Sequence, residues 1–287
     1  MQNGDNIWEL PFEPGKAAEL ELRSEWGSLA LLPVESGQRP RLELTRGSCE
    51  SVAVKVDKIG DVVRVALDPH RNWFGGWECR ATLYVPRDVH AAVETNAGSI
   101  SVRGLEACEL GIKASAGKID LVEVYGVMHL AAEAGSINGR AVGGYFDVET
   151  QAGSVRLEIL DLQPGEHRIR ATMGSVRVEL ARGMDVCIET HTAMGSVRTS
   201  YPVRQAAPAR LMLSTEMGSI RVEEGPPFRP THRQFVSEAP PQSAPAPPVA
   251  TKDRPPDPEL ERILKMVEAG ELSARDADEL LRAMGRV

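Results

Sequence analysis

The sequence is poor in the residues on which several common kinds of protein depend. Its four cysteines are spread over 287 residues without a C-x-x-C pair, which excludes a small disulfide-rich scaffold and offers no zinc-ligand spacing. Aromatic residues make up only 5% of the chain, and no stretch approaches the roughly 18 consecutive apolar residues of a membrane-spanning helix. We therefore expect no metal, no cofactor and no direct insertion into a membrane.

Basic charge and catalytic motifs are also scarce. The 33 lysines and arginines are outnumbered by 41 acidic residues, and the net charge of -8 argues against a general nucleic-acid-binding protein. The first residues carry neither the basic nor the apolar part of an export signal, so we expect a cytoplasmic protein. The P-loop, G-x-S-x-G and H-E-x-x-H motifs do not occur, and we expect no enzymatic activity.

What the chain has in abundance is a short repeat. Seven copies of a pattern around Gly, followed by Ser in six of them, run from residue 96 to residue 222, and successive glycines lie 18 to 23 residues apart. A period near 20 residues with short β-like runs is typical of a β-solenoid, in which each copy forms one coil. A related copy, Trp26-Gly27-Ser28, lies far upstream. The corner glycines of the seven coils are Gly98, Gly117, Gly135, Gly153, Gly174, Gly195 and Gly218.

Residues at fixed distances from each glycine indicate which side chains are buried. The residue two positions after it is always Ile or Val, and the residue five positions before it is apolar in six copies, which predicts two inward-facing columns. We expect glycine at each bend because only glycine accepts a positive φ without cost. The residue before the glycine is Ala in four copies and Met173, Met194 or Met217 in the others, and we interpret this column as core that fills the corner.

The regions on either side of the repeats have a different composition. Residues 1 to about 90 contain alternating runs without a strict period, which predict irregular strands and a cap. Eleven prolines between residues 226 and 258 predict a flexible linker, and the residues after them follow a helical period. We therefore predict a β-solenoid over residues 1–224, a proline-rich linker over 225–256 and a helical hairpin over 257–287.

The predicted hairpin has an apolar face that needs a partner. Two helices in about 30 residues are too few for an independent core, so this face should dock onto a second copy, the solenoid or another protein. We expect a protein partner or self-association through it, with a homo-oligomer as one outcome. The docking face consists of Leu260, Ile263, Leu264, Val267, Leu280 and Leu281.

Two segments resemble known families. The run Leu83-Tyr84-Val85-Pro86, followed by the first Gly-Ser-Ile copy at Gly98, resembles the bacterial putative-adhesin family, a domain of unknown function, over about residues 40 to 224. That resemblance implies a right-handed parallel β-solenoid without enzymatic activity and a link to envelope stress. The segment 263–274 is similar to the SHOCT-like helical hairpin, over residues 257–285, which implies oligomerisation or protein docking.

A row of arginines is the main candidate surface. Four copies carry Arg three positions after the glycine, and we expect these side chains to face outward on four successive coils, about 4.8 Å apart. Such a row could bind a polyanion or an acidic partner. Pairing with glutamates two residues farther on is the favoured alternative. The arginines are Arg156, Arg177, Arg198 and Arg221, and the glutamates are Glu158, Glu179 and Glu223.

A second candidate is the aromatic loop of Trp73, Phe74 and Trp77 beside two glycines. Exposed, it would contact a sugar or a partner peptide, whereas a flap packed over the solenoid is the favoured alternative.

Taken together, these patterns predict a non-enzymatic scaffold for protein–protein interaction, which the resemblance places in a bacterial envelope-stress or adhesin-like assembly. Two alternatives stay open. One is a self-assembling cytoskeletal solenoid, and the other is a polysaccharide-acting β-solenoid enzyme, which would need paired carboxylates on neighbouring coils.

Overall fold

The computed structural model describes residues 6–13, 18–45, 52–69, 80–202, 204 and 207–227. The chain divides into two units, residues 1–233 and 234–287, and every described residue lies in the first. Within the described residues the protein is all-β, with twelve strands and no helix. The predicted aromatic loop, most of the predicted linker and the predicted hairpin lie outside the described residues.

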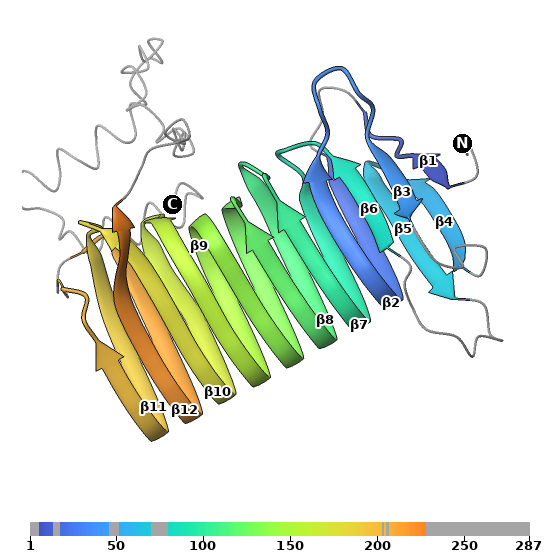
Figure 1. Cartoon of the computed structure of the whole chain (residues 1–287). Helices are drawn as coiled ribbons and strands as arrows, with labels where there is room; N and C mark the ends of the chain where they lie inside the picture. The colour runs from blue at the N-terminus through green and yellow to red at the C-terminus, as the bar shows by residue number, and fades with distance from the viewer. Residues whose placement is uncertain are drawn as a thin grey trace, which may run out of the picture. The chain divides into compact units, whose positions relative to one another are not determined.

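The twelve strands form one mixed sheet (Figure 1). Their order is β1-β3-β6-β2-β7-β8-β9-β10-β12-β11, and β4 and β5 form an antiparallel hairpin that joins this path where β5 pairs with β2. The strands are β1 (Ile7–Glu9), β2 (Glu19–Pro33), β3 (Arg41–Thr45), β4 (Val52–Ile59), β5 (Val62–Pro69), β6 (Arg80–Val85), β7 (His90–Arg103), β8 (Cys108–Val122), β9 (Tyr125–Leu162), β10 (Gly165–Arg182), β11 (Val186–Thr199) and β12 (Ala209–Pro227).

Pairing between the long strands is parallel and aligns the repeats copy on copy. Gly98 lies opposite Gly117, and Gly174 lies opposite both Gly153 and Gly218. The upstream copy takes part as well, because Gly27 on β2 lies opposite Gly98 on β7. The repeat therefore sets the register of the sheet from β2 to β11, as the sequence predicts.

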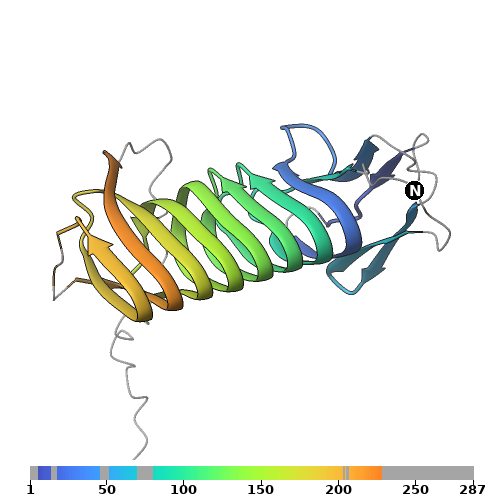
Figure 2. The same cartoon turned by 60° about the horizontal axis from the view of Figure 1, so that its bottom comes forward.

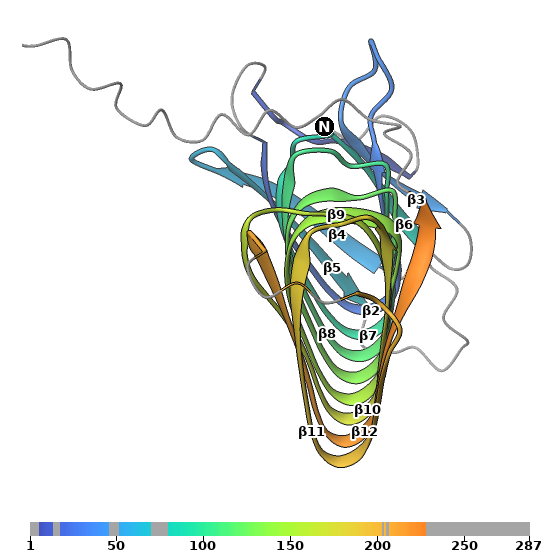
Figure 3. The same cartoon turned by 90° about the vertical axis from the view of Figure 1, so that its left-hand side faces the viewer.

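The glycines allow each long strand to bend. Viewed along the stack, the strands β7 to β12 trace nested V shapes (Figure 3). The φ of Gly153 is +156°, and a Cβ built there would lie 1.6 Å from the carbonyl oxygen of Gly135 on the neighbouring copy. Neighbouring backbones thus approach too closely for any side chain, and this steric limit adds to the unfavourable φ.

The core fills the space between the two arms of the V. Both predicted inward columns are confirmed, and their members are at most 2% exposed from β7 to β10 and on β12. Each buried Val, Leu or Ile contributes about 1.5–3 kcal/mol relative to an exposed one, so stacking favours one register strongly. The columns are Ile100, Ile119, Ile137, Val155, Val176 and Ile220 on one arm, and Val93, Ile112, Leu130, Val148, Ile169 and Leu213 on the other.

The last two copies are exchanged in space relative to their order in the chain. The strand β12 lies between β10 and β11, and Figures 1 and 2 show β11 at the end of the sheet. The prediction of four successive coils in chain order is therefore wrong at this point. The physical reason lies in the inward columns, where β12 has Leu213 and Val222 opposite Thr190 and Thr199 of β11. The more apolar strand occupies the position that is covered on both sides.

The N-terminal strands depart from the parallel pattern. Two antiparallel pairings, β1 with β3 and β3 with β6, lie beyond β2 at the end of the sheet remote from β11. The irregular strands predicted for residues 1 to about 90 are confirmed as β1 to β6. At the other end of the described region, β12 continues to Pro227, three residues beyond the predicted end of the solenoid.

Candidate binding surfaces

The four arginines lie in one row on the outer side of one arm. Arg177 lies opposite both Arg156 and Arg221, and Arg221 lies opposite Arg198. The spatial order is therefore Arg156, Arg177, Arg221, Arg198, with the last residue on the end strand. All four side chains are exposed or half-buried, since their neighbours in the chain on both sides face inward.

Glutamates pair with the middle of this arginine row. The Glu223 carboxylate lies 3.8 Å from Nε of Arg177 and 3.7 Å from Nε of Arg221. Within the described residues, no carboxylate lies within 4.0 Å of Arg156 or Arg198. Pairing with a glutamate, the favoured alternative, therefore applies to the two inner arginines. The two outer arginines are exposed and have no such partner within the described residues. Exposed pairs of this kind contribute about 0–1 kcal/mol each.

The residues before the glycines lie on the outside of the bend. Met173 and Met217 are each 48% exposed and Met194 is 68% exposed, so the interpretation of this column as core is wrong. The physical reason is the positive φ of the following glycine, which breaks the inward–outward alternation and turns the preceding side chain away from the core. We call Met173, Met217 and Met194 the methionine ridge. They are neighbours across β10, β12 and β11.

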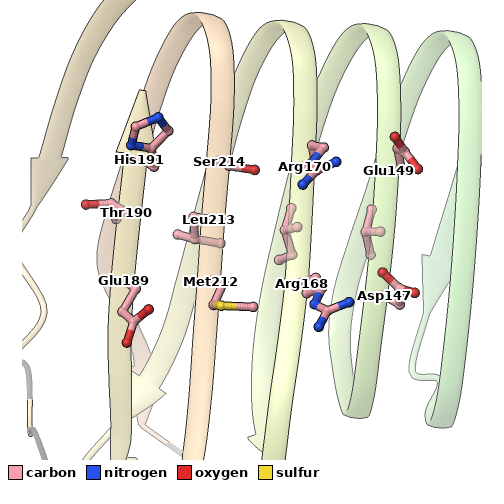
Figure 4. A pocket seen from close by; sticks show the side chains of 12 residues that line it. Asp147, Glu149, Arg168, Arg170, Glu189, Thr190, His191, Met212, Leu213 and Ser214 are labelled. Atoms are coloured by element: carbon pink, nitrogen blue, oxygen red, sulfur yellow. The ribbon is translucent and has the colours of Figure 1, made fainter. Parts of the chain in front are cut away.

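A hollow on the outer side of the other arm was not foreseen from the sequence. It has a volume of about 550 Å³ and lies over β9, β10, β12 and β11 (Figure 4). Two rows of side chains cross it, at the positions six and four residues before the glycines. The first row is Asp147, Arg168, Met212 and Glu189, and the second is Glu149, Arg170, Ser214 and His191.

The same outer face carries several ion pairs beyond the hollow. Nε of Arg64 lies 2.7 Å from the Glu21 carboxylate, and Nε of Arg23 lies 3.3 Å from the Glu94 carboxylate. Oppositely charged residues thus often lie side by side on neighbouring strands, which neutralises this face locally. Sequence order hides the arrangement, since the partners are far apart in the chain.

His167 and Cys108 are buried and have perturbed pKa values. Burial lowers the pKa of His167, which is fully buried, although its hydrogen bond to the Gln163 carbonyl acts in the opposite direction. His167 Nδ1 accepts from the Phe146 N–H at 3.2 Å, and Nε2 lies 2.7 Å from the Gln163 carbonyl oxygen. Burial also raises the pKa of the Cys108 thiol to about 12, so this cysteine is an unreactive core residue.

Two predicted binding surfaces lie outside the described residues. They are the aromatic loop of Trp73, Phe74 and Trp77 and the docking face of the predicted hairpin. In the part of the chain that is described, no group of three or more His, Cys, Asp or Glu residues is positioned to hold a metal ion. That same part has no helix of the length and apolarity needed to cross a bilayer.

Comparison with known proteins gives one sequence match. Residues 258–286 match the model of the SHOCT-like domain, which confirms the resemblance of the C-terminal segment. No curated protein matches the chain.

Two solved structures are similar to the chain at low identity. One is a putative cell adhesion protein from Clostridium sporogenes, with 11% identity, a TM-score of 0.38 and coverage of 76% of this chain and 98% of that one. The other is a putative adhesin from Bacteroides fragilis, with 9% identity, a TM-score of 0.38 and coverage of 75% and 94%.

Proposed function

We propose that the chain is a right-handed parallel β-solenoid that acts as a non-enzymatic scaffold for protein–protein interaction. The in-register sheet supports this function, because it holds outward side chains in straight rows across eight glycine-centred copies, Gly27 included. Such rows offer a partner one extended surface with regular spacing.

The observation that carries the proposal is the methionine ridge together with Arg198, the open end of the arginine row on β11. Exposed methionines adapt to apolar partner surfaces, and arginines bind carboxylates through two parallel hydrogen bonds. Met194 and Arg198 lie four residues apart on β11, and both are exposed. In a chain with a net charge of -8, this apolar and cationic patch fits a protein segment that carries acidic and apolar side chains.

The test compares partner recovery by two full-length variants. Met173, Met194 and Met217 are all changed to Ser in one, and Ala97, Ala116 and Ala134, which lie in the same column, are changed to Ser in the control. We expect the methionine variant to recover a defined partner at least about tenfold less than wild type, and the control to match wild type. Equal recovery by all three proteins would remove the ridge from the proposal.

The arginine row has a test of its own. Arg177→Ala and Arg198→Ala are combined, and binding to heparin as a polyanion probe is measured at low salt. Weaker binding by the double variant supports a role in binding acidic groups, whereas unchanged binding would remove the arginine row from the proposed function.

The C-terminal segment supplies the second part of the proposed function. Its match to the SHOCT-like domain and its apolar stripe support docking onto a protein, in a bacterial envelope-stress or adhesin-like assembly. The full chain with Ile263→Glu and Leu264→Glu should lose this interaction. Glu261→Lys, a change in the same segment outside the stripe, should keep it.

The proposal excludes catalysis, and the hollow is the place to test that exclusion. Asp147, Glu149 and Glu189 line it together with Arg168 and Arg170, and glycoside hydrolysis would use such carboxylates in pairs. We expect the purified full chain to release no reducing sugar from any polysaccharide. Hydrolysis of a polysaccharide by the wild type, lost in Glu149→Gln, would show that the protein is an enzyme and would overturn the proposed scaffold function.

A further inference from the structure

The end strand β11 has an open edge. Its inner edge pairs with β12 from Val186 to Thr199, and no strand in the described part of the chain pairs with its outer edge. About half of its fourteen residues therefore present backbone N–H and C=O groups on that side, because successive residues of a strand direct these groups to opposite edges. The Val186 carbonyl at the start of the strand already accepts from the Arg204 N–H at 3.4 Å. Such an edge is a template for pairing with another strand.

The two inward-facing residues of β11 that form the last members of the two core columns are exposed to solvent. Val197 is 39% exposed, whereas Ile220 and Val176, the next two members of its column, are 1% and 0% exposed. Thr190, the β11 member of the other column, is exposed as well. A strand that paired with the outer edge would cover both residues.

We propose that β11 pairs antiparallel with β11 of a second copy of this chain, about a two-fold axis at the bend of the V. In this arrangement the axis passes between Ala193 and Met194, next to Gly195, so that residue pairs whose numbers sum to 387 lie opposite each other across the interface. Glu189 then lies opposite Arg198 of the second copy, and Thr190 lies opposite Val197 of the second copy. Both pairs form twice, because a two-fold interface is self-complementary.

This register suits the chemistry on both sides of the strand. Glu189 and Arg198 face outward and carry opposite charges, and Arg198 has no ion-pair partner within the described residues. Thr190 and Val197 face inward and are both β-branched, so they extend the core across the axis. Glu189 also lies 3.5 Å from Nε of Arg210 on β12 and can hold both cations with its two oxygens.

A second copy fits this edge in a closed dimer and not in a filament. The opposite end of the sheet carries the antiparallel strands β1 and β3, so it presents a different edge from that of β11. Head-to-tail growth would require those two ends to match, whereas two β11 edges match by symmetry. The inference shares Arg198 with the proposed function, but its test measures self-association and needs no partner of the methionine ridge or of the SHOCT-like segment.

A charge swap in the full chain tests the register directly. Wild type, Glu189→Arg, Arg198→Glu and the double variant are compared by light scattering over a range of concentrations in low salt. We expect a dimer for wild type, a dissociation constant at least about tenfold higher for each single variant, and recovery to within about threefold in the double variant. Two pairs become repulsive in each single variant, and both are restored in the double.

Control variants separate this interface from other modes of association. Arg156→Glu and Asp147→Arg change the residues at the far ends of the same two rows and should leave the dimer intact. Ile263→Glu with Leu264→Glu should also leave it intact, and a dimer that only this variant disrupts would assign association to the hairpin and overturn the proposal. A monomeric wild type, or a dimer that none of the charge variants weakens, would overturn it too. Unchanged circular dichroism shows that each variant folds.

Discussion

The strands β12 and β11 carry nearly the same sequence around their glycines and have opposite environments. Both contain Met-Gly-Ser followed by a β-branched residue and Arg, and they pair in register over thirteen positions from Val186 to Thr199, Ala193 excepted. The side chains of β12 that face the core are at most 2% exposed, whereas most of β11 is exposed. The difference shows that the repeat signature defines the bend and the register, while residues outside the signature decide which copy is buried.

The largest expected effect comes from adding a methyl group at the bend of the buried strand. A Cβ at Gly218 would lie 1.6 Å from the carbonyl oxygen of Gly174, and neither backbone can move because strands flank both. We expect Gly218→Ala to remove more than about 4 kcal/mol of the free energy of unfolding, or to prevent folding. The measurement is chemical denaturation followed by circular dichroism.

The end strand provides the comparison for that substitution. A Cβ at Gly195 meets the Gly218 carbonyl oxygen at 1.6 Å as well, but β11 has an open side and can move outward, so Gly195→Ala should cost clearly less. Gly111→Ala is the neutral control, since its Cβ would approach nothing closer than 4.0 Å. Equal losses for the substitutions at Gly218 and Gly195 would show that β11 is held as firmly as β12.

The inward column gives the second test of the comparison. Leu213 on β12 is 1% exposed, and Leu213→Ala should lower the free energy of unfolding by about 2–5 kcal/mol through lost burial and a new cavity. Thr190 lies opposite it on β11 and is exposed, so Thr190→Ala should change the free energy of unfolding by no more than about 0.5 kcal/mol. A large cost at Thr190 in dilute solution would mean that something covers the end of the column.

The difference between β12 and β11 also explains which parts of the fold the sequence predicts and which it does not. Spacing identifies the corner glycines and both core columns, since each depends on residues within one copy, and it even detects the isolated copy at Gly27. Spacing fails where neighbours in space decide the outcome. The exchange of β11 and β12 depends on Thr190 competing with Leu213 for a covered position, which involves residues of two different copies.

The surfaces follow the same rule. The arginines can be found in the sequence because each has the same distance to its glycine, but the pairing of Arg177 with Glu223 depends on the exchanged order of the strands. The hollow escaped prediction because its rows join Asp147, Arg168, Met212 and Glu189, which share no residue type. The sequence wrongly predicts a buried methionine ridge because the alternation of inward and outward side chains stops at a glycine whose φ is positive.

The buried histidine of β10 extends the comparison to pH. His167 on β10 is fully buried, and burial lowers its pKa below the usual value of 6.5. The unfolded chain therefore binds a proton that the folded chain does not, so the stabilisation is fully present above pH 6.5 and is lost as the pH falls toward the lowered pKa. We expect the free energy of unfolding to decrease as the pH falls below 6.5. His167→Gln should flatten this dependence.

The smallest expected effect concerns two arginines of the same row. Arg177 lies within 3.8 Å of the Glu223 carboxylate, and Arg198 on the end strand has no ion-pair partner in the described part of the chain. At low protein concentration and low salt, Arg177→Ala should therefore cost about 0.5 kcal/mol of stability, and Arg198→Ala should cost nothing measurable. In about 1 M salt the difference should vanish, because the Debye length falls to about 3 Å and the pair is exposed. A difference that persists in salt would mean that Arg177 stabilises the sheet through its packed aliphatic stem, and the arginine row would then differ between buried and end strands in packing as well as in charge.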